Sequence, residues 1–181
     1  MDKVRLAYFG TGRFAQKQHL AELNKWKNVV VEYAVSPSQT DREQFARMHQ
    51  EWKGSRPQLF ASLEEFLSPN PDFDGAVIAT PVDSHFALAC ALLDLGKPLY
   101  VEKPFMSTRA EAQEIADKAD RLHVPVVIGA NRCVFPAYRT AANALRSGVI
   151  GNVGGLLFCY EHSWDTLTKD CSWRQDPNHP A

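Results

Sequence analysis

The sequence contains little cysteine, and the cysteines that are present lie far apart. They are Cys90, Cys133, Cys159 and Cys171, and no two of them form a C-x-x-C pair. This spacing argues against the usual zinc-binding patterns and against a disulfide framework, so we expect no metal site. We interpret the side chains as free thiols, which predicts a protein of the reducing cytoplasm.

Long apolar runs and an excess of basic charge are also missing. No apolar stretch approaches the ~18 residues of a membrane-spanning helix, so we expect no membrane partner. The formal net charge is −1, from 20 basic and 21 acidic side chains. Because nucleic-acid binding needs a clustered basic surface, we expect no nucleic-acid partner either. These absences exclude classes of function without selecting one.

A short apolar segment near the beginning, residues 4–9, has the pattern of a buried strand and leads directly into a turn that contains glycine. The turn reads Gly10-Thr11-Gly12-Arg13-Phe14-Ala15, a G-x-G-x-x-A pattern. The helix that it opens is expected to run through Gln18, Leu20, Leu23 and Trp26.

Each small residue of this turn has a physical role in dinucleotide binding. Gly10 permits the tight turn, Gly12 lets the backbone approach a pyrophosphate, and Ala15 allows close packing of helix against strand. The N-terminus of the helix adds free N–H groups and a positive dipole end. The turn therefore predicts dinucleotide binding, with an ordinary glycine-rich turn as the alternative.

The segments that follow alternate between apolar strands and helices. We expect strands at 29–35, 59–60, 75–79, 98–101 and 124–128, and helices at 41–52, 63–67, 84–95 and 108–122. Near-continuous apolar strands in such alternation predict an α/β fold with a Rossmann doubly wound parallel sheet. This domain should occupy residues 1–130. Residues 131–181 are expected to begin a second, truncated α+β domain, with a helix at 136–147 and a strand at 155–161.

One polar motif follows the expected strand at 75–79, where the carboxyl ends of such strands bind ligands. It contains Thr80 and Pro81, followed by Ser84 and His85. Pro81 directs the chain out of the sheet, and Ser84 is expected to cap the next helix. A capped turn without a ligand is the alternative interpretation, although a cap and a cofactor contact are compatible.

A second motif, Glu102-Lys103-Pro104, follows the expected strand at 98–101. Glu102 and Lys103 cannot both face the core cheaply, because burying a charge is costly unless it is paired. A lysine beside a carboxylate and a bound cofactor can donate or accept a proton if burial disfavours its charged form. Lys103 is therefore the candidate catalytic residue, and the alternative is a surface Lys-Pro turn.

These motifs, together with Asn131-Arg132 and Trp173-Arg174, follow one another in the order and spacing of a known family. The chain resembles the Gfo/Idh/MocA family, the relatives of glucose–fructose oxidoreductase and inositol dehydrogenase, over essentially its whole length. The resemblance implies a Rossmann domain and a substrate domain on a large open β-sheet, with NAD(P) bound between them. It also implies hydride transfer at a hydroxyl or carbonyl of a small sugar-like or polyol-like substrate, and homo-oligomers of the full-length chain.

Site residues follow from the same resemblance. Lys103 resembles the active-site lysine of the family. The residues implied to lie near the nicotinamide and its ribose are Thr80, Pro81, His85 and Glu102. Those implied to reach cofactor or substrate from the second domain are Asn131, Arg132, Trp173 and Arg174.

The end of the chain departs from the family pattern. Family members usually continue with a glycine pair and an Asp-x-x-x-His helix that carries a catalytic histidine, and this chain stops before that element. Asp176 and His179 lie in a tail bounded by prolines, so we assign them no catalytic role. We interpret the chain as a fragment, inactive by itself, of a protein about twice as long, because so short a second domain cannot bury a sheet face.

The choice between NADP and NAD depends on the end of the second expected strand. A ribose-binding acid should stand there, but the sequence has Ser36-Pro37-Ser38. Ser36 and Ser38 can donate hydrogen bonds to a 2′-phosphate, and Arg42 can pair with it. The pattern therefore favours NADP over NAD, with a solvated Arg42 and serines that only shape the turn as the alternative.

Two other classes of function remain open at this point. A dinucleotide-binding or redox-sensing module without catalysis would fit the missing histidine element, although truncation explains that absence more simply. A methyltransferase that uses S-adenosylmethionine also places a glycine turn after its first strand. That class predicts an acid closing the second strand, which the sequence lacks, and offers no reason for Glu102-Lys103-Pro104.

Overall fold

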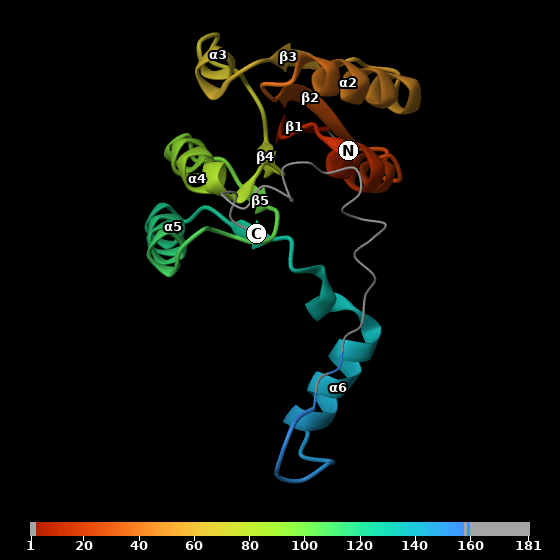
Figure 1. The fold of residues 1–181 in the computed structure, drawn as a ribbon, viewed down its shortest axis with the longest axis vertical. Helices are drawn as coiled ribbons and strands as arrows, with labels where there is room; N and C mark the ends of the chain where they lie inside the picture. Colours follow the sequence, from red (N-terminus) through yellow and green to blue (C-terminus); the bar gives the residue numbers. More distant parts are fainter. Residues whose placement is uncertain (1–2, 158, 160–181) are drawn as a thin grey trace. The chain divides into compact units, whose positions relative to one another are not determined.

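The computed structural model describes residues 3–157 and 159 of the chain. The chain divides into two compact units, residues 1–129 and 130–181. Within the described part of the first unit the strands are β1 (Val4–Phe9), β2 (Val29–Val35), β3 (Gln58–Phe60), β4 (Gly75–Ile78), β5 (Leu99–Val101) and β6 (Val126–Ile128) (Figure 1).

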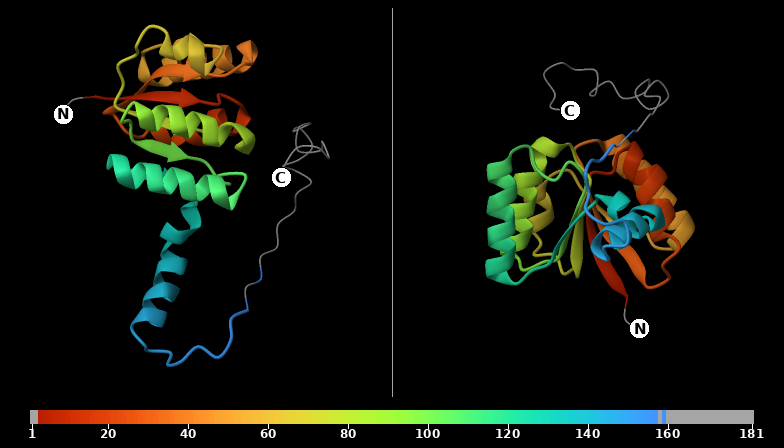
Figure 2. Two further views of the ribbon diagram at one scale, coloured as in Figure 1. Left: turned by 90° about the vertical axis from the view of Figure 1, so that its left-hand side faces the viewer. Right: turned by 90° about the horizontal axis from the view of Figure 1, so that it is seen from below.

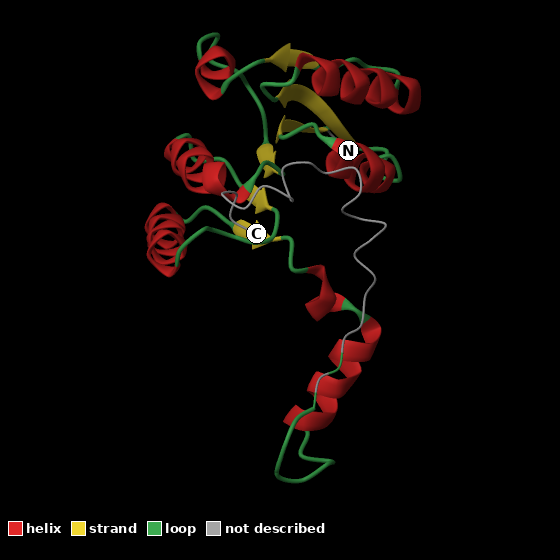
Figure 3. Cartoon of the chain, viewed as in Figure 1, coloured by secondary structure: helices red, strands yellow, loops and turns green. Residues whose placement is uncertain are grey.

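Helices follow most of these strands, as the colouring by secondary structure in Figure 3 shows. In the first unit they are η1 (Ala15–His19), α1 (Leu20–Leu23), α2 (Gln39–Lys53), α3 (Leu63–Leu67), η2 (Val82–Ser84), α4 (His85–Asp94) and α5 (Arg109–Leu122). The expectation that the first helix extends through Trp26 is wrong. That helix ends at Leu23, and the Trp26 side chain is 62% exposed, so no core contact extends the helix.

Local sequence explains where the longer helices begin and end. At the start of α5 the Thr108 hydroxyl accepts from the Glu111 N–H, and the Glu111 carboxylate accepts from the Thr108 N–H. This reciprocal pair satisfies two backbone donors that the first turn leaves without partners. α2 ends at Gly54, whose φ of 75° is left-handed and therefore costs glycine little.

The strands of the described residues form a six-stranded sheet in the order β3-β2-β1-β4-β5-β6, and every neighbouring pair is parallel. The chain runs outward from β1 to β3 and then returns to β4 beside β1. The predicted doubly wound α/β fold is thus confirmed. The strand order reverses between β1 and β4, and such a switch point leaves a crevice for ligands at the carboxyl ends of the strands.

Helices cover both faces of this sheet, as the views in Figures 1 and 2 both show. α3, α4 and α5 pack on one face, where Phe9 and Ile78 of the sheet belong to the same buried cluster as Phe66 of α3. η1, α1 and α2 pack on the other, where Tyr8 of β1 meets Phe45 of α2. Because successive residues of a strand point to opposite faces, Tyr8 and Phe9 contribute to different cores.

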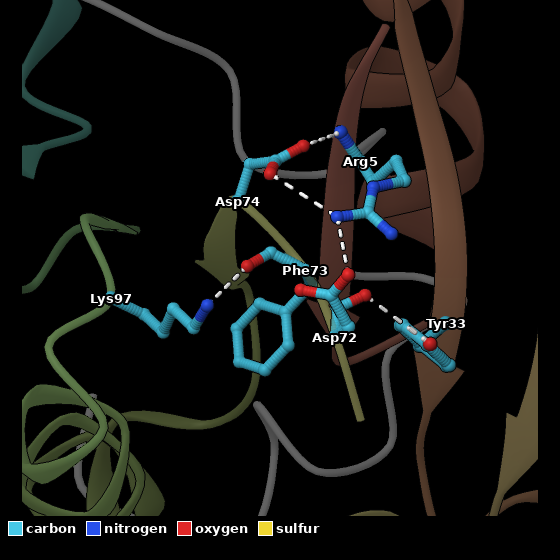
Figure 4. A network of polar contacts seen from close by, with 6 residues as sticks. All are labelled: Arg5, Tyr33, Asp72, Phe73, Asp74 and Lys97. Carbon is cyan, nitrogen blue, oxygen red and sulfur yellow. Dashed lines mark hydrogen bonds and ion pairs between the residues drawn. The ribbon is translucent and has the colours of Figure 1, made fainter. Parts of the chain in front are cut away.

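A polar network closes the amino-terminal edge of the sheet (Figure 4). The Arg5 N–H donates to Asp74 at 2.7 Å, and the Arg5 guanidinium pairs with Asp72 at 2.9 Å. Lys97 donates to the carbonyl of Phe73 and lies 4.8 Å from the centre of its ring. These contacts fix the segment that leads into β4 between the first strand and the loop before β5.

The second unit begins with η3 (Asn131–Val134), which is followed by α6 (Pro136–Arg146). Pro136 stands in the first turn of α6, where a missing N–H costs nothing. The strand expected at 155–161 is not observed in its described part, since residues 155–157 and 159 lie in no strand. Among residues 3–157 and 159, no helix is both long enough and apolar enough to cross a membrane.

Candidate functional site

The glycine turn joins the carboxyl ends of three strands. Gly10 follows β1 with a φ of 92°, and its N–H donates to the Val35 carbonyl at the end of β2. A Cβ on Gly10 would stand 2.5 Å from the carbonyl carbon of Ala79, just after β4. A Cβ on Gly12 would meet nothing within 4 Å. Gly10 is therefore required by the fold, whereas Gly12 leaves open space beside the backbone.

The remaining residues of the turn divide between the interior and the surface. Arg13 and Phe14 are exposed, whereas Thr11 and Ala15 are buried. The buried Thr11 Oγ1 has no hydrogen-bond partner among the described residues. A buried hydroxyl without a protein partner is unusual in a native protein, and a bound ligand or water would supply the missing partner.

Gln16, which sequence reasoning missed, holds this turn from below. Its side chain is buried, and its Nε2 donates to the Thr11 carbonyl at 2.8 Å. The same amide lies 3.4 Å from the Asp41 carbonyl in the first turn of α2. No feature of the sequence marks this contact, because a glutamine directly after the glycine motif is ordinary at the start of a helix.

Ser36, Ser38 and Arg42 lie close together after β2, as the spacing predicts. The side chains of Ser38 and Arg42 form hydrogen bonds with backbone groups of this segment. The Ser38 hydroxyl accepts from the Asp41 N–H at 3.2 Å and so caps α2. The Arg42 guanidinium donates to the Ser36 carbonyl. Ser36 is buried, and its N–H donates to the Phe60 carbonyl. Their role toward a 2′-phosphate stays a prediction.

The loop after β4 differs from the expected helix cap. Ser84 makes no side-chain capping bond at α4, so that expectation is wrong. The short helix η2 intervenes, and the Ser84 Oγ turns back to lie 2.7 Å from Thr80 Oγ1 and 2.8 Å from the Pro81 carbonyl. The hydroxyl therefore closes the turn after the strand instead of starting the helix.

His85 is buried between two loops. Its Nε2 lies 2.9 Å from the Thr80 carbonyl, and its Nδ1 lies 3.0 Å from the Phe105 carbonyl. Both ring nitrogens thus face the backbone of the protein. The observed contacts connect the loop after β4 with the segment that follows Pro104.

The two charged residues after β5 lie in different environments: Glu102 is buried and Lys103 is exposed. Glu102 Oε1 accepts from the Tyr100 hydroxyl at 2.9 Å and lies 3.1 Å from His19 Nε2, while Oε2 accepts from the Lys103 N–H at 3.0 Å. The Lys103–Pro104 peptide is cis. Both oxygens of the Glu102 carboxylate thus have hydrogen-bond partners within the protein, whereas the Lys103 side chain is exposed to solvent.

The hydrogen bonds to Glu102 decide its protonation. Burial acts to raise the pKa of this carboxyl, but the bonds from His19, Tyr100 and the Lys103 N–H outweigh it, so the pKa lies below its ordinary value. Burial and the neighbouring carboxylate raise the pKa of Tyr100 to about 12. At neutral pH the site therefore contains an ionised carboxylate beside a neutral phenol.

The remaining predicted site residues belong to the second unit, residues 130–181. Asn131 and Arg132 belong to η3 of the second unit, and both are exposed. Trp173 and Arg174 lie outside the described residues. Across the described part of the chain, no group of three or more His, Cys, Asp or Glu side chains is arranged to hold a metal ion.

A hollow of about 390 Å³ opens at the opposite, amino-terminal edge of the sheet. It is lined by Leu67, Asn70, Pro71, Asp72, Leu95 and Lys97. Since open parallel sheets bind ligands at the carboxyl ends of their strands, the glycine turn and not this hollow is the candidate site.

Known proteins share both this fold and parts of this sequence. The rhizopine catabolism protein MocA of Rhizobium meliloti is 27% identical over 174 residues, which span 96% of this chain and 51% of that protein. The 3-ketoreductase KijD10 of Actinomadura kijaniata, in complex with NADP, has a TM-score of 0.67 at 20% identity, covering 83% of this chain and 46% of that one.

An oxidoreductase of Agrobacterium radiobacter, in complex with NAD⁺, L-tartaric acid and magnesium, has a TM-score of 0.68 at 21% identity, covering 83% of this chain and 42% of that one. This chain spans only about half the length of the curated relative MocA.

A family model covers the whole first unit apart from its first residues. The model, an oxidoreductase family with an NAD-binding Rossmann fold, matches residues 4–130. The prediction of a nicotinamide cofactor, NADP or NAD, agrees with the NAD-binding fold of that family. The chain belongs to the Gfo/Idh/MocA oxidoreductases, and its first unit is their NAD(P)-binding Rossmann domain.

Proposed function

We propose that this chain is the cofactor-binding part of an enzyme that transfers hydride between NAD(P) and a hydroxyl or carbonyl carbon of a sugar-like or polyol-like substrate. The observation that carries the proposal is the glycine turn at the switch point between β1 and β4. The Glu102-Lys103 segment leaves the same edge of the sheet. A ligand that spans this edge can contact both.

The residues of the turn fit a dinucleotide. Gly12 leaves the space that a pyrophosphate needs for close approach to the backbone. The unpartnered Thr11 hydroxyl stands in the same turn. We assign the phosphates to the segment Gly10–Ala15, which includes the exposed Arg13 and Phe14.

Lys103 is the proposed catalytic residue. Its side chain is exposed at the carboxyl end of β5, whereas the adjacent Glu102 is held inside. A bound nicotinamide would supply or receive the hydride, and Lys103 would move the proton of the substrate hydroxyl. Thr80 and Pro81 would border the nicotinamide beside Lys103, and His85 contacts the Thr80 carbonyl.

For the adenosine end we propose a preference for NADP. The segment that directly follows β2, Ser36-Pro37-Ser38, has no carboxylate that would repel a 2′-phosphate, and Arg42 contacts its backbone. The Arg42 guanidinium contacts a backbone carbonyl, which leaves other donors of its planar fork for a phosphate.

The substrate class, the second-domain contacts and the assembly are proposals for the whole protein. The KijD10 complex belongs to a 3-ketoreductase, and this supports a carbonyl or hydroxyl substrate for this chain. Asn131, Arg132, Trp173 and Arg174 would reach the cofactor or substrate from the second unit. We expect a homo-oligomer of the full-length protein in the cytoplasm, and a fragment that binds cofactor without turnover.

Titration of the chain with NADPH and with NADH, followed by intrinsic tryptophan fluorescence, tests the proposal. We expect saturable binding of both, with NADPH tighter. Arg42→Ala should weaken NADPH by about 1.5–3 kcal/mol more than NADH, because a charge-assisted bond is lost. Arg47→Ala, an exposed arginine of the same helix, is the matched control and should change neither affinity.

Each outcome bears on a different part of the proposal. The absence of saturable binding to either cofactor would contradict dinucleotide binding by this part of the chain. Equal losses for both cofactors with Arg42→Ala would show that Arg42 supports only the fold, and would remove the argument for NADP.

A further inference from the structure

His19 connects two parts of the site that are far apart in the sequence. It is the last residue of η1, the helix that the glycine turn opens. Its Nε2 lies 3.1 Å from Glu102 Oε1, and its Nδ1 contacts the hydroxyl of Tyr8. The side chains of His19 and Glu102 are only 16% and 10% exposed, so water screens this contact little.

Aromatic packing also holds the imidazole of His19. Its ring meets three aromatic rings edge to face, with centroid distances of 5.0 Å to Phe14, 5.7 Å to Tyr100 and 6.0 Å to Tyr8. One consistent set of protons satisfies the network. The His19 Nε2–H donates to Glu102, and the Tyr8 hydroxyl donates to His19 Nδ1.

The acceptor of this network is itself confined. The Glu102 N–H donates to the Ile78 carbonyl at 2.8 Å, which fixes the backbone to the end of β4. A Cβ on Gly129 would stand 2.8 Å from Glu102 Oε1 and from the Tyr100 hydroxyl. The space around the Glu102 carboxylate is therefore filled. The carboxylate fits there only because Gly129 has no side chain.

We infer that His19 is a positioning residue, which holds the Glu102 carboxylate and so sets the Glu102-Lys103 segment relative to the glycine turn. The carboxylate transmits this restraint, because its other oxygen accepts from the Lys103 N–H at 3.0 Å. The inference rests on the proposed function, in which the turn binds the phosphates and the Glu102-Lys103 segment borders the nicotinamide.

This role predicts a selective loss of affinity. A ligand that contacts only the turn and the end of β2 does not depend on the position of Glu102. A ligand that also contacts the segment after β5 does, since its affinity includes the cost of ordering that segment. A residue that only stabilised the fold would affect both ligands alike.

The test compares NADPH with 2′-phospho-ADP, which keeps the pyrophosphate but lacks both the nicotinamide and its ribose, on the 181-residue chain. We expect His19→Phe, which keeps the ring packing but removes both nitrogens, to weaken NADPH about tenfold. The same variant should bind 2′-phospho-ADP like the wild type. His19→Gln retains a donor for Glu102 and should recover part of the NADPH affinity.

A double-mutant cycle with Glu102→Gln makes the test specific. If His19 acts through Glu102, the two substitutions together should weaken NADPH less than the product of their separate effects. Urea unfolding of each variant separates affinity from stability.

Three results would overturn the inference. One is an equal loss for both ligands, another is no loss for either, and the third is failure of both His19 variants to fold, which would assign the residue to stability alone. If the wild type binds neither ligand, the proposed function fails instead.

Discussion

The Val31 N–H donates a hydrogen bond to Nε2 of His49 across 3.0 Å. β3 pairs with β2 only from Tyr33 onward, so Val31 lies where β3 does not reach. His49 of α2 takes the place of that missing strand partner. Its Nδ1 lies 2.8 Å from the Ser55 carbonyl and therefore carries the proton, which makes the buried ring a neutral tautomer.

Stability should fall as the solution is acidified, and His49 should cause part of that fall. Burial lowers the pKa of His49, with Lys53 adding to the effect and the Ser55 carbonyl acting against it. The unfolded chain, with an ordinary histidine pKa of about 6.5, then binds a proton before the folded chain does. The stabilisation is present above that pH and is lost as pH decreases, by at most about 1.4 kcal/mol per pH unit for one proton.

Urea unfolding at pH 7.5 and pH 5.5 measures this loss. His49→Gln, which can still accept from Val31 but does not titrate, should lose less stability between the two pH values than the wild type. His123→Gln changes an exposed histidine and should keep the wild-type dependence. Identical dependence in all three proteins would show that His49 contributes nothing to it.

The two glycines of the turn should respond differently to alanine. Gly10→Ala places a Cβ 2.5 Å from the Ala79 backbone at a φ of 92°, and should lower the free energy of unfolding by at least about 2 kcal/mol. Gly12→Ala meets no atom and should cost about 0.5 kcal/mol or less.

Gly12→Ala should nevertheless weaken NADPH about tenfold or more, because the new methyl group occupies the space that the pyrophosphate needs. Urea unfolding and the fluorescence titration measure the two effects on the same protein samples. Wild-type affinity in Gly12→Ala would contradict the placement of the phosphates at this turn.

Phe66 should be among the most costly side chains to remove. It is fully buried, and it packs within 5.3–5.7 Å, between ring centroids, of Phe9, Tyr33, Phe60 and Phe73. Phe66→Ala leaves a cavity among these rings and should cost about 3–5 kcal/mol in urea unfolding. Trp26→Ala, at a side chain that is 62% exposed, should cost much less.

The fold was predictable because its signals are local. Apolar strands, polar turns and helix periodicity recur along residues 4–128, and they indicate the parallel α/β architecture without knowledge of any long-range contact. The capping pair of Thr108 and Glu111 and the cap at Ser38 act within one helical turn. The expected helices at 41–52 and 108–122 consequently differ from α2 and α5 by at most two residues at either end.

The polar contacts of the site were not predictable in the same way. His19 and Glu102 stand 83 residues apart, and neither residue type identifies its partner. The prediction that Ser84 caps α4 was wrong. Serine is a suitable capping residue, but the short helix η2 directly precedes α4, and the local sequence does not indicate η2. Motifs therefore indicate the loops of the candidate site, and tertiary packing decides which atoms meet there.

The place of β1 between β2 and β4 has a consequence for a chain that is still being synthesised, because these two neighbours come from distant parts of the sequence. β2 and β3 follow β1 closely, whereas β4 begins only at Gly75, and the bond between Arg5 and Asp74 spans 69 residues. A nascent chain in which β4 has not yet emerged can pair β1 with β2 but leaves the other edge of β1 open. Such an edge is a template for pairing with another copy, and the arrival of β4 removes it.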